Sequence, residues 1–445
     1  MSTAIELPHA KRTLANGLDV VVHEDRRVPI VAIYLWYHVG SKNERVGRTG
    51  FAHLFEHMMF TGSQHVPPGD HPKILESVGA EMNGTTNEDR TLYFDVVPAG
   101  ELETALWLES DRMGFLLPAM TQERLDAQRG IVQNERRQGV DNQPFGIANE
   151  SVRAALFPPS NPYSWDVIGS MKDLSAASLE DVKDFFRHYY APNNATLAIV
   201  GDVSPAQAKA VAAKYFAELP RGPAIERPTI AALTLPREKR LVLEDTRART
   251  AQIRFAWPTV GADNPDRFAL SALGSVLTLD RTSRLTKALV YDRQLATNVF
   301  AGNTTYENGG QFSINVIPRP TASLTDIEQV VDSVLASVGT TSPSAVEITR
   351  AANFRTVGSI SGLQSDLNKA INVANGSATY GDPNALFKQI ANMAAVTPSE
   401  VQRAAQRYLG PGRVVLSMVP AGKLDMVAKP NLPFENVTPT PGVKP

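Results

Sequence analysis

The feature that most constrains the fold is a segment that occurs twice. SLEDVKDFFRHYYAPNNATLAIVGDV begins at Ser178, and TPSEVQRAAQRYLGPGRVVLSMVPAG begins at Thr397. A shift of 219 residues aligns Tyr189 with Tyr408. In both copies a helical pattern ends in a turn rich in Pro, Gly or Asn, and a β-prone run follows. Such self-similarity indicates a duplicated structural unit.

A second pair of segments supports the duplication. LPHAKRTL at Leu7 resembles LPREKRLVL at Leu235, at a shift of 228 residues. With 445 residues the chain is also too long for one ordinary core. We therefore expect an N-terminal domain at 1–222, a proline-rich linker at 223–234, a homologous C-terminal domain at 235–428 and an irregular tail at 429–445.

Each half predicts an α+β fold. A few β-prone runs come first, and long helical patterns follow, for example at 118–139 and 178–189. A closing helix–strand unit ends each half. We expect two homologous domains, each a β-sheet with helices packed on it.

Composition excludes several functions. The formal net charge of −2 gives no electrostatic case for binding nucleic acid or an anionic membrane. The absence of cysteine excludes disulfides and thiolate metal sites. No run reaches the roughly 18 apolar residues of a membrane span, and MSTAIELPHAKRTL lacks the apolar core of a signal peptide. We expect a soluble protein, cytoplasmic as written, or periplasmic if a signal segment was removed.

GFAHLFEHMMFTG, at residues 50–62, contains the densest group of potential ligands. His53 and His57 are four residues apart and share one face of a helix, and Glu56 lies beside them. The flanks favour a helix, because residues 51–60 contain neither Pro nor Gly. Two imidazoles can bind zinc, but a histidine on an apolar face is often only a hydrogen-bonded core residue. The spacing alone leaves both interpretations open. Since all eight histidines lie at or before His188, imidazole chemistry belongs to the first half.

A catalytic zinc usually has three protein ligands, so a third should exist. The best placed is Glu135, which follows Leu125, Gln128 and Ile131 or Val132 on one helix face. The alternative is an exposed glutamate beside two arginines. The candidates in the first half include Glu76, Glu81, Glu88, Glu109 and Glu135.

His53-Leu54-Phe55-Glu56-His57 is the inverted zinc motif H-x-x-E-H. The chain resembles the insulinase/pitrilysin family of metallopeptidases, particularly short members such as bacterial and mitochondrial processing peptidases. The resemblance extends over WYHVGSKNERVGRTGFAHLFEHMMFTGS, GAEMNGTTNEDRTLYFDVV and RGIVQNERRQ. Together with the duplicated halves it covers most of residues 5–425.

This resemblance implies one Zn²⁺ per chain, bound in the N-terminal domain by His53, His57 and Glu135. It also implies that Glu56 is the general base. Relatives often have a second carboxylate seven residues before the ligand glutamate, and Gln128 occupies that position here. The amide could still support the site by hydrogen bonding. Asn83 matches a family residue near the strand to which substrate adds, although an asparagine here could also simply form a turn.

The resemblance fails in the second half at two positions. Active relatives usually have an Arg and a Tyr seven residues apart, which bind the substrate carbonyl and the oxyanion. In SRLTKALVYDRQLATNV these positions are Val290 and Thr297, while Tyr291 and Arg293 lie nearby but out of register. We therefore expect a heterodimer in which a homologous subunit supplies the missing pair.

The expected function is zinc-dependent endopeptidase subunit, hydrolysing peptides or unfolded segments in a closed chamber. The alternative is a non-catalytic structural subunit, like the respiratory-complex core proteins of this family. Scaffold relatives usually have an eroded motif, whereas the H-x-x-E-H residues are present here. A non-proteolytic hydrolase has no separate motif in its favour, because the chain contains neither a P-loop nor a G-x-S-x-G elbow.

Overall fold

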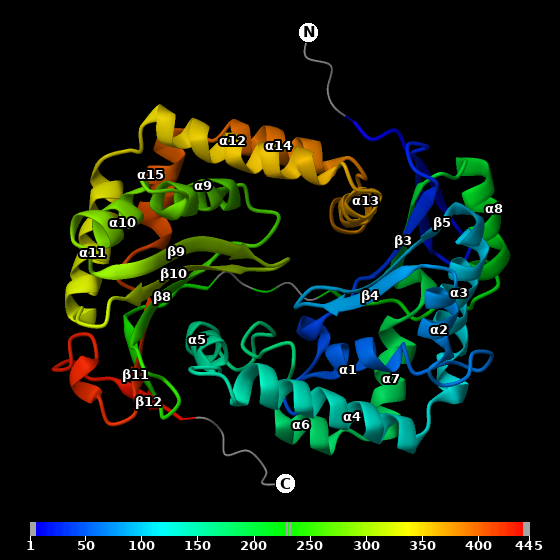
Figure 1. Ribbon diagram of the computed structural model, residues 1–445, viewed down its shortest axis with the longest axis horizontal. Helices are drawn as coiled ribbons and strands as arrows, with labels where there is room; N and C mark the ends of the chain where they lie inside the picture. Colours follow the sequence, from blue (N-terminus) through cyan, green and yellow to red (C-terminus); the bar gives the residue numbers. More distant parts are fainter. Residues whose placement is uncertain (1–5, 228–229, 231–232, 439–445) are drawn as a thin grey trace. The chain divides into compact units, whose positions relative to one another are not determined.

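The computed structural model describes residues 6–227, 230 and 233–438. Of the expected linker, residues 228–229 and 231–232 lie outside this range, as do residues 439–445 of the expected tail and residues 1–5 of the expected N-terminal domain. The chain forms two compact units (Figure 1). Unit 1 contains Met1–Asn134, Asp166–Arg227 and Gly358–Gln389, and unit 2 contains Glu135–Trp165, Pro228–Val357 and Ile390–Pro445.

Unit 1 is built on a six-stranded mixed sheet with the order β1-β2-β6-β3-β5-β4. Apolar residues of α1, α3, α7 and α8 pack on one face of this sheet, and α13 packs on the other. The strands are β1 (Ala10–Thr13), β2 (Asp19–Glu24), β3 (Ile30–Tyr37), β4 (Glu81–Thr86), β5 (Thr91–Pro98) and β6 (Ala195–Gly201). The helices are α1 (Phe51–Met58), α2 (Asp70–Ser77), α3 (Leu102–Ala119), α6 (Met171–Ala176), α7 (Leu179–Tyr189), α8 (Pro205–Phe216) and α13 (Asp366–Tyr380).

Unit 2 contains a second six-stranded sheet, with the order β12-β7-β11-β8-β10-β9. Its helices α9, α11 and α15 pack on one face, and α5 packs on the other. The strands are β7 (Lys239–Asp245), β8 (Gln252–Thr259), β9 (Ala296–Thr305), β10 (Gly310–Pro318), β11 (Val414–Pro420) and β12 (Glu435–Val437). The helices are α5 (Ala148–Leu156), α9 (Asp266–Thr278), α10 (Arg284–Thr286), η5 (Lys287–Asp292), α11 (Leu324–Thr340) and α15 (Pro398–Tyr408).

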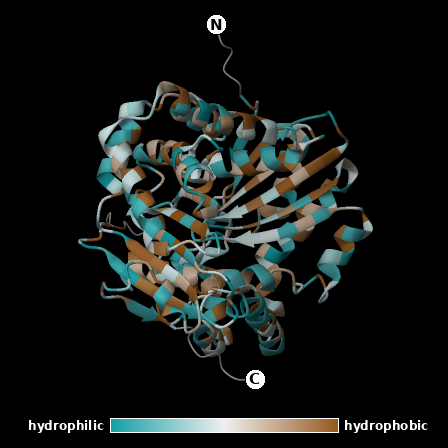
Figure 2. Cartoon of the chain, turned by 60° about the vertical axis from the view of Figure 1, so that its left-hand side comes forward, coloured by the Kyte–Doolittle hydropathy of each residue, from teal (hydrophilic) through white to brown (hydrophobic). Residues whose placement is uncertain are grey.

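Three further helices span a boundary between the two units, namely α4 (Gln122–Arg136), α12 (Ala345–Gly362) and α14 (Ala385–Ala394). Hydrophobic and hydrophilic residues alternate along many of the helices (Figure 2), as expected for helices that pack with one face on a sheet. In the part of the chain that the structure describes, no helix has the length and hydrophobicity needed to cross a membrane.

The two sheets repeat one topology, which confirms the predicted α+β fold with two similar domains. β2, β6, β3, β5 and β4 correspond in order to β7, β11, β8, β10 and β9. The helices before the closing strands also match, because α7 and α15 each begin with a capping box, at Ser178 and at Thr397. The sixth strands differ: β1 is antiparallel to β2, whereas β12 is parallel to β7.

The sequence similarity between Leu7 and Leu235 does not mark equivalent strands. LPHAKRTL forms β1, but LPREKRLVL leads into β7, whose place in the sheet corresponds to β2. The uniform shift of 219 also fails in the closing strand. Leu197 packs on the face that carries α7, whereas Leu416 packs on the face that carries α5. Since neighbouring strand residues point to opposite faces, the two copies differ by an odd number of residues in the preceding turn.

Each half of the sequence contributes a helix to the other half's sheet. From the second half, α13 packs on β3 and β6, where Ala370, Val373 and Ala374 contact Tyr34 and Ala198. From the first half, α5 packs on β8 and β11. Both sheets are therefore completed by segments that are distant in the sequence.

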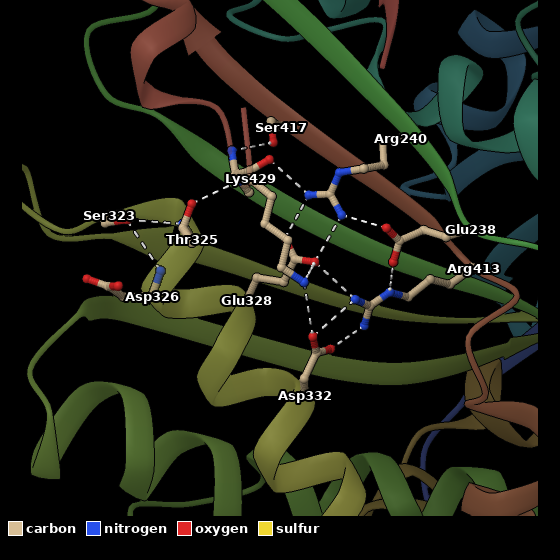
Figure 3. A network of polar contacts seen from close by, with 11 residues as sticks. Glu238, Arg240, Ser323, Thr325, Asp326, Glu328, Asp332, Arg413, Ser417 and Lys429 are labelled. Carbon is tan, nitrogen blue, oxygen red and sulfur yellow. Dashed lines mark hydrogen bonds and ion pairs between the residues drawn. The ribbon is translucent and has the colours of Figure 1, made fainter. Parts of the chain in front are cut away.

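A network of buried charges attaches the C-terminal segment to unit 2 (Figure 3). Arg240 of β7 and Arg413 both form ion pairs with Glu328 of α11, which is fully buried. Lys429 pairs with the same carboxylate at 2.7 Å. Part of the segment expected to be irregular is therefore ordered: Glu435–Val437 forms β12, because β7 offers it a free edge on which to pair.

Candidate metal centre

Helix α1 holds His53, Glu56 and His57 at the surface of the first core. It begins after Gly50, whose φ of 89° favours glycine. Its apolar residues Leu54, Phe55 and Met58 are buried. Four-residue spacing then brings the two imidazole rings together, with centroids 4.8 Å apart. The helix predicted at residues 51–60 is thus present, and its polar residues share one side.

A carboxylate that sequence reasoning missed stabilises the start of α1. Glu44 accepts hydrogen bonds from the backbone N–H of Gly50 at 3.0 Å and of Ala52 at 2.8 Å. A negative charge at a helix N-terminus satisfies exposed donors and complements the helix dipole. The available signal was an acidic residue shortly before a predicted helix start, which is common on protein surfaces.

His53, His57 and Glu135 come together in the structure. Each offers one ligand atom, and these atoms all lie within 4.8 Å of one another. All three residues are partly buried. Burial, followed by the nearby His57, lowers the pKa of His53 to about 4. His53 is therefore neutral near pH 7, which is the form that can bind a metal ion. Two imidazoles and one carboxylate are a donor set suited to zinc.

Glu135 occupies the last turn of α4. Leu125 and Val132 of this helix are buried, and Gln128 and Glu135 are half-buried, as the predicted stripe requires, whereas Ile131 is exposed. Gln128 therefore lies on the same side of α4 as Glu135. Other candidate carboxylates lie elsewhere: Glu76 and Glu81 are exposed, and Glu109 is fully buried in an ion pair with Arg112.

Glu56 lies against the edge of the first sheet. A Cβ added to Gly84 of β4 would lie 3.1 Å from Glu56 Cγ, so the strand backbone packs closely on this side chain. β4 pairs with β5 and is the last strand in the sheet order. Asn83 lies on β4 and is exposed, and its Oδ1 accepts a hydrogen bond from the N–H of Gly84. Asn83 is thus on a strand and not in a turn.

Residues 283–299, where relatives have an Arg and a Tyr that this chain lacks, lie in unit 2. Val290 is half-buried in η5, and Thr297 is exposed on β9, where its hydroxyl donates to the carbonyl of Ile317 at 3.1 Å. Tyr291 and Arg293 are exposed at the end of η5 and just beyond it. The two positions therefore lie on different elements: Val290 has no polar side-chain atom, and the hydroxyl of Thr297 is donated to a backbone carbonyl.

Comparison with known proteins agrees with these features. Residues 19–160 match the family model of Insulinase (Peptidase family M16), and residues 176–354 match that of the Peptidase M16 inactive domain. Zinc protease PqqE of Helicobacter pylori is 29% identical over 310 residues, which are 68% of each chain. A probable mitochondrial-processing peptidase subunit beta of Arabidopsis thaliana is 22% identical over 92% of this chain and 77% of its own.

The fold has close counterparts among solved structures. The crystal structure of a protease from Helicobacter pylori superposes with a TM-score of 0.86 at 25% identity, covering 94% of this chain and all of the other. Two family models thus match successive parts of the chain, and the relatives include zinc proteases and a processing-peptidase subunit. The chain belongs to the insulinase family, peptidase family M16.

Proposed function

We propose that the chain is the zinc-bearing subunit of an endopeptidase. The observation that carries the proposal is the convergence of His53, His57 and Glu135, with Glu56 on the same helix as the two histidines. The zinc-protease names of several relatives support the same chemistry. We further propose one Zn²⁺ per chain, because this group offers three ligands, the number typical of catalytic zinc.

His53, His57 and Glu135 would hold the zinc ion, which would supply a Lewis acid for polarising a carbonyl and for making a water molecule more acidic. Glu56 takes a proton from the attacking water and passes it to the leaving amine, so that one peptide bond and one water give a carboxylic acid and an amine. His53 is neutral and keeps its lone pair for the metal. Gln128 lies on the side of α4 that carries Glu135 and is placed to support the site through its amide.

We propose that the substrate is an extended peptide or unfolded segment. β4 is a sheet edge next to Glu56, and its outer side offers backbone groups on which a substrate strand can pair. Asn83 lies on this strand and is accessible to a bound peptide. Pairing through the backbone favours extended chains over folded proteins, which fits a reaction inside a closed chamber.

The absent Arg/Tyr pair supports a heterodimer. With Val290 and Thr297 at the corresponding positions, unit 2 offers neither an arginine nor a tyrosine there, and the Thr297 hydroxyl already donates to Ile317. We propose that a homologous subunit supplies them. The similarity to a processing-peptidase subunit named beta is consistent with a two-subunit enzyme.

Hydrolysis of an internally quenched peptide by the single chain, and by the chain with a homologous subunit of the same organism, tests this function. We expect slow cleavage alone and fast cleavage in the complex. Glu56→Gln should lower kcat in the complex by about 10²- to 10⁴-fold, the usual contribution of a general base. Normal turnover by the Glu56→Gln complex would refute the assigned base, and full activity of the single chain would refute the need for a partner.

A further inference from the structure

The sheet of unit 2 has one face that α5 covers only in part. The apolar residues of α5 pack with β7, β11 and β8, and this core contains no residue of β10 or β9 among the described residues. The part of the face outside this core, here called the β10–β9 face, is exposed at Phe300 and Thr304 of β9 and half-buried along β10. It consists of Gln311, Ser313 and Asn315 of β10 and their cross-strand neighbours Thr304, Gly302 and Phe300 of β9. β9 is also one of the two edge strands of this sheet (Figure 1).

Arg254 lies where α5 meets the β10–β9 face. It is on β8, directly opposite Asn315, and it donates a hydrogen bond to Asn149 of α5. Its Nε is buried and has no hydrogen-bond partner among the described residues, and no ion pair of Arg254 with a carboxylate is found there. Burial lowers the pKa of Arg254. The side chain as a whole is half-buried and its hydrogen bond to Asn149 lies at the surface, so an anion can reach the guanidinium and offset the cost of its buried Nε.

Next to Arg254, two amide side chains of β10 also have buried oxygen atoms without a hydrogen-bond partner among the described residues. Asn315 Oδ1 and Gln311 Oε1 are buried and lack hydrogen-bond partners among the described residues. They lie on one strand, four residues apart, so they face the same side. A side-chain amide carries both donors and an acceptor and can pair with a peptide's main chain. Phe300, opposite Asn315, exposes 60% of its surface and offers an apolar contact.

We propose that the β10–β9 face binds an extended peptide that carries a carboxylate, with Arg254 binding the carboxylate. The amides of Asn315 and Gln311 pair with the peptide's main chain, and Phe300 packs on one of its apolar side chains. The carboxylate comes from an acidic side chain or from the peptide's C-terminus, since both present the same two oxygens to an arginine. The assignment of a peptide as ligand rests on the proposed function, but this site makes and breaks no bond.

Peptide binding to the full-length Glu56→Gln chain tests the site without cleavage. Three fluorescein-labelled peptides share one extended sequence: one with a central Glu and an amidated C-terminus, one with Gln and an amidated C-terminus, and one with Gln and a free C-terminus. Fluorescence anisotropy gives each Kd. We expect a carboxylate-bearing peptide to bind about tenfold more tightly than the amidated Gln peptide, as for one charge-assisted hydrogen bond. Which of the two binds tightly identifies the source of the carboxylate.

Arg254→Met should remove this preference, and Arg249→Met, which removes an exposed arginine of the same unit, should keep it. Asn315→Leu should weaken all three peptides equally. Without peptide, Arg254→Met should melt at the same temperature or higher, because an unpaired charge is lost. Equal binding of all three peptides, or an unchanged preference in Arg254→Met, would overturn the site. Both outcomes are independent of hydrolysis, so they leave the catalytic proposal to its own test.

Discussion

His71 is a buried imidazole outside the metal centre. It lies on α2 with 2% of its surface exposed, and its Nε2 has no hydrogen-bond partner among the described residues. Its ring meets that of Phe60 edge to face at 6.0 Å. Burial, followed by the charge of Arg112, lowers the pKa of His71 to about 2. The folded chain therefore holds this side chain neutral at every pH at which the protein is handled.

This residue should make stability fall as pH falls. In the unfolded chain His71 takes up a proton below about pH 6.5, whereas in the folded chain it does not until about pH 2. Because only the unfolded chain protonates His71 in this range, the free energy of unfolding falls by about 2 kcal/mol between pH 7 and pH 5. Urea denaturation at both pH values should show a loss about 2 kcal/mol larger in the wild type than in His71→Leu, in which the contribution from the lowered pKa of His53 remains. His9→Leu, at an exposed histidine, should behave like the wild type; an equal loss in His71→Leu would refute the argument.

Local spacing made His53 and His57 candidate ligands, but the helix stripe left Glu135 open, and the family resemblance singled it out. His53 and His57 are one helical turn apart, and Glu135 follows a stripe whose buried members are Leu125 and Val132. Arg254 could not be predicted, because its significance depends on the absence of a carboxylate partner. Whether Arg254 has such a partner depends on residues of other strands and helices, and the alternating apolar pattern of its own strand does not predict which residues these are.

At the scale of elements, Glu328 of α11 pairs with Arg240 of β7, with Arg413 just before β11 and with Lys429 of the C-terminal segment. Burial raises its pKa, but the hydrogen bonds from Arg240 and Lys429 outweigh this and leave the pKa lowered, so the group stays ionised (Figure 3). Glu328→Gln leaves Arg240 and Arg413 without their buried counter-charge. We expect a loss of about 3–5 kcal/mol in the free energy of unfolding.

Chemical denaturation of the wild type, Glu328→Gln and Lys429→Met measures how much free energy of unfolding each substitution removes. Lys429 is partly exposed, so its removal should cost no more than about 1 kcal/mol. Similar stabilities of wild type and Glu328→Gln would show that the network does not attach the C-terminal segment.

Element types were more predictable than element boundaries and faces. The helix expected at 178–189 is α7, and its capping residue Ser178 marks the start. The helical pattern at 118–139 is divided instead, because Pro118 is tolerated in the last turn of α3 and α4 begins at Gln122. The faces of β6 and β11 depend on the length of the turn before each strand, and the Tyr repeated at a fixed shift does not reveal that length.

At the scale of the whole molecule, the exchanged helices make the two halves interdependent. A fragment of residues 6–227 lacks α13 and therefore exposes the sheet face that contains Ala32, Tyr34 and Ala198. We expect this fragment alone to bind the dye ANS and to unfold without a sharp transition. Mixing it with a fragment of residues 228–445 should restore cooperative unfolding, as followed by circular dichroism. A sharp transition in the isolated fragment would contradict this interdependence.

The sequence did not predict that α13 packs on the sheet of the first half and α5 on the sheet of the second half. The repeat indicated two similar units and hence two similar sheets, because each copy carries its own helix–strand pattern. Which sheet a helix covers depends on the path of the connections, and a repeat of equal halves is compatible with either choice. Packing of Ala370 and Val373 on Tyr34 decides it in the structure.

We expect His53, His57 and Glu135 to hold one catalytic zinc ion. Zinc per chain, measured by mass spectrometry after dialysis against a zinc buffer, tests it most directly. We predict one zinc in the wild type, in Glu56→Gln and in Glu123→Gln, which removes an exposed carboxylate of the same helix. Glu135→Gln should bind zinc at least about 10- to 100-fold more weakly, since even an outer-shell change causes that loss. Full zinc occupancy of Glu135→Gln at the same buffered concentration would contradict the account.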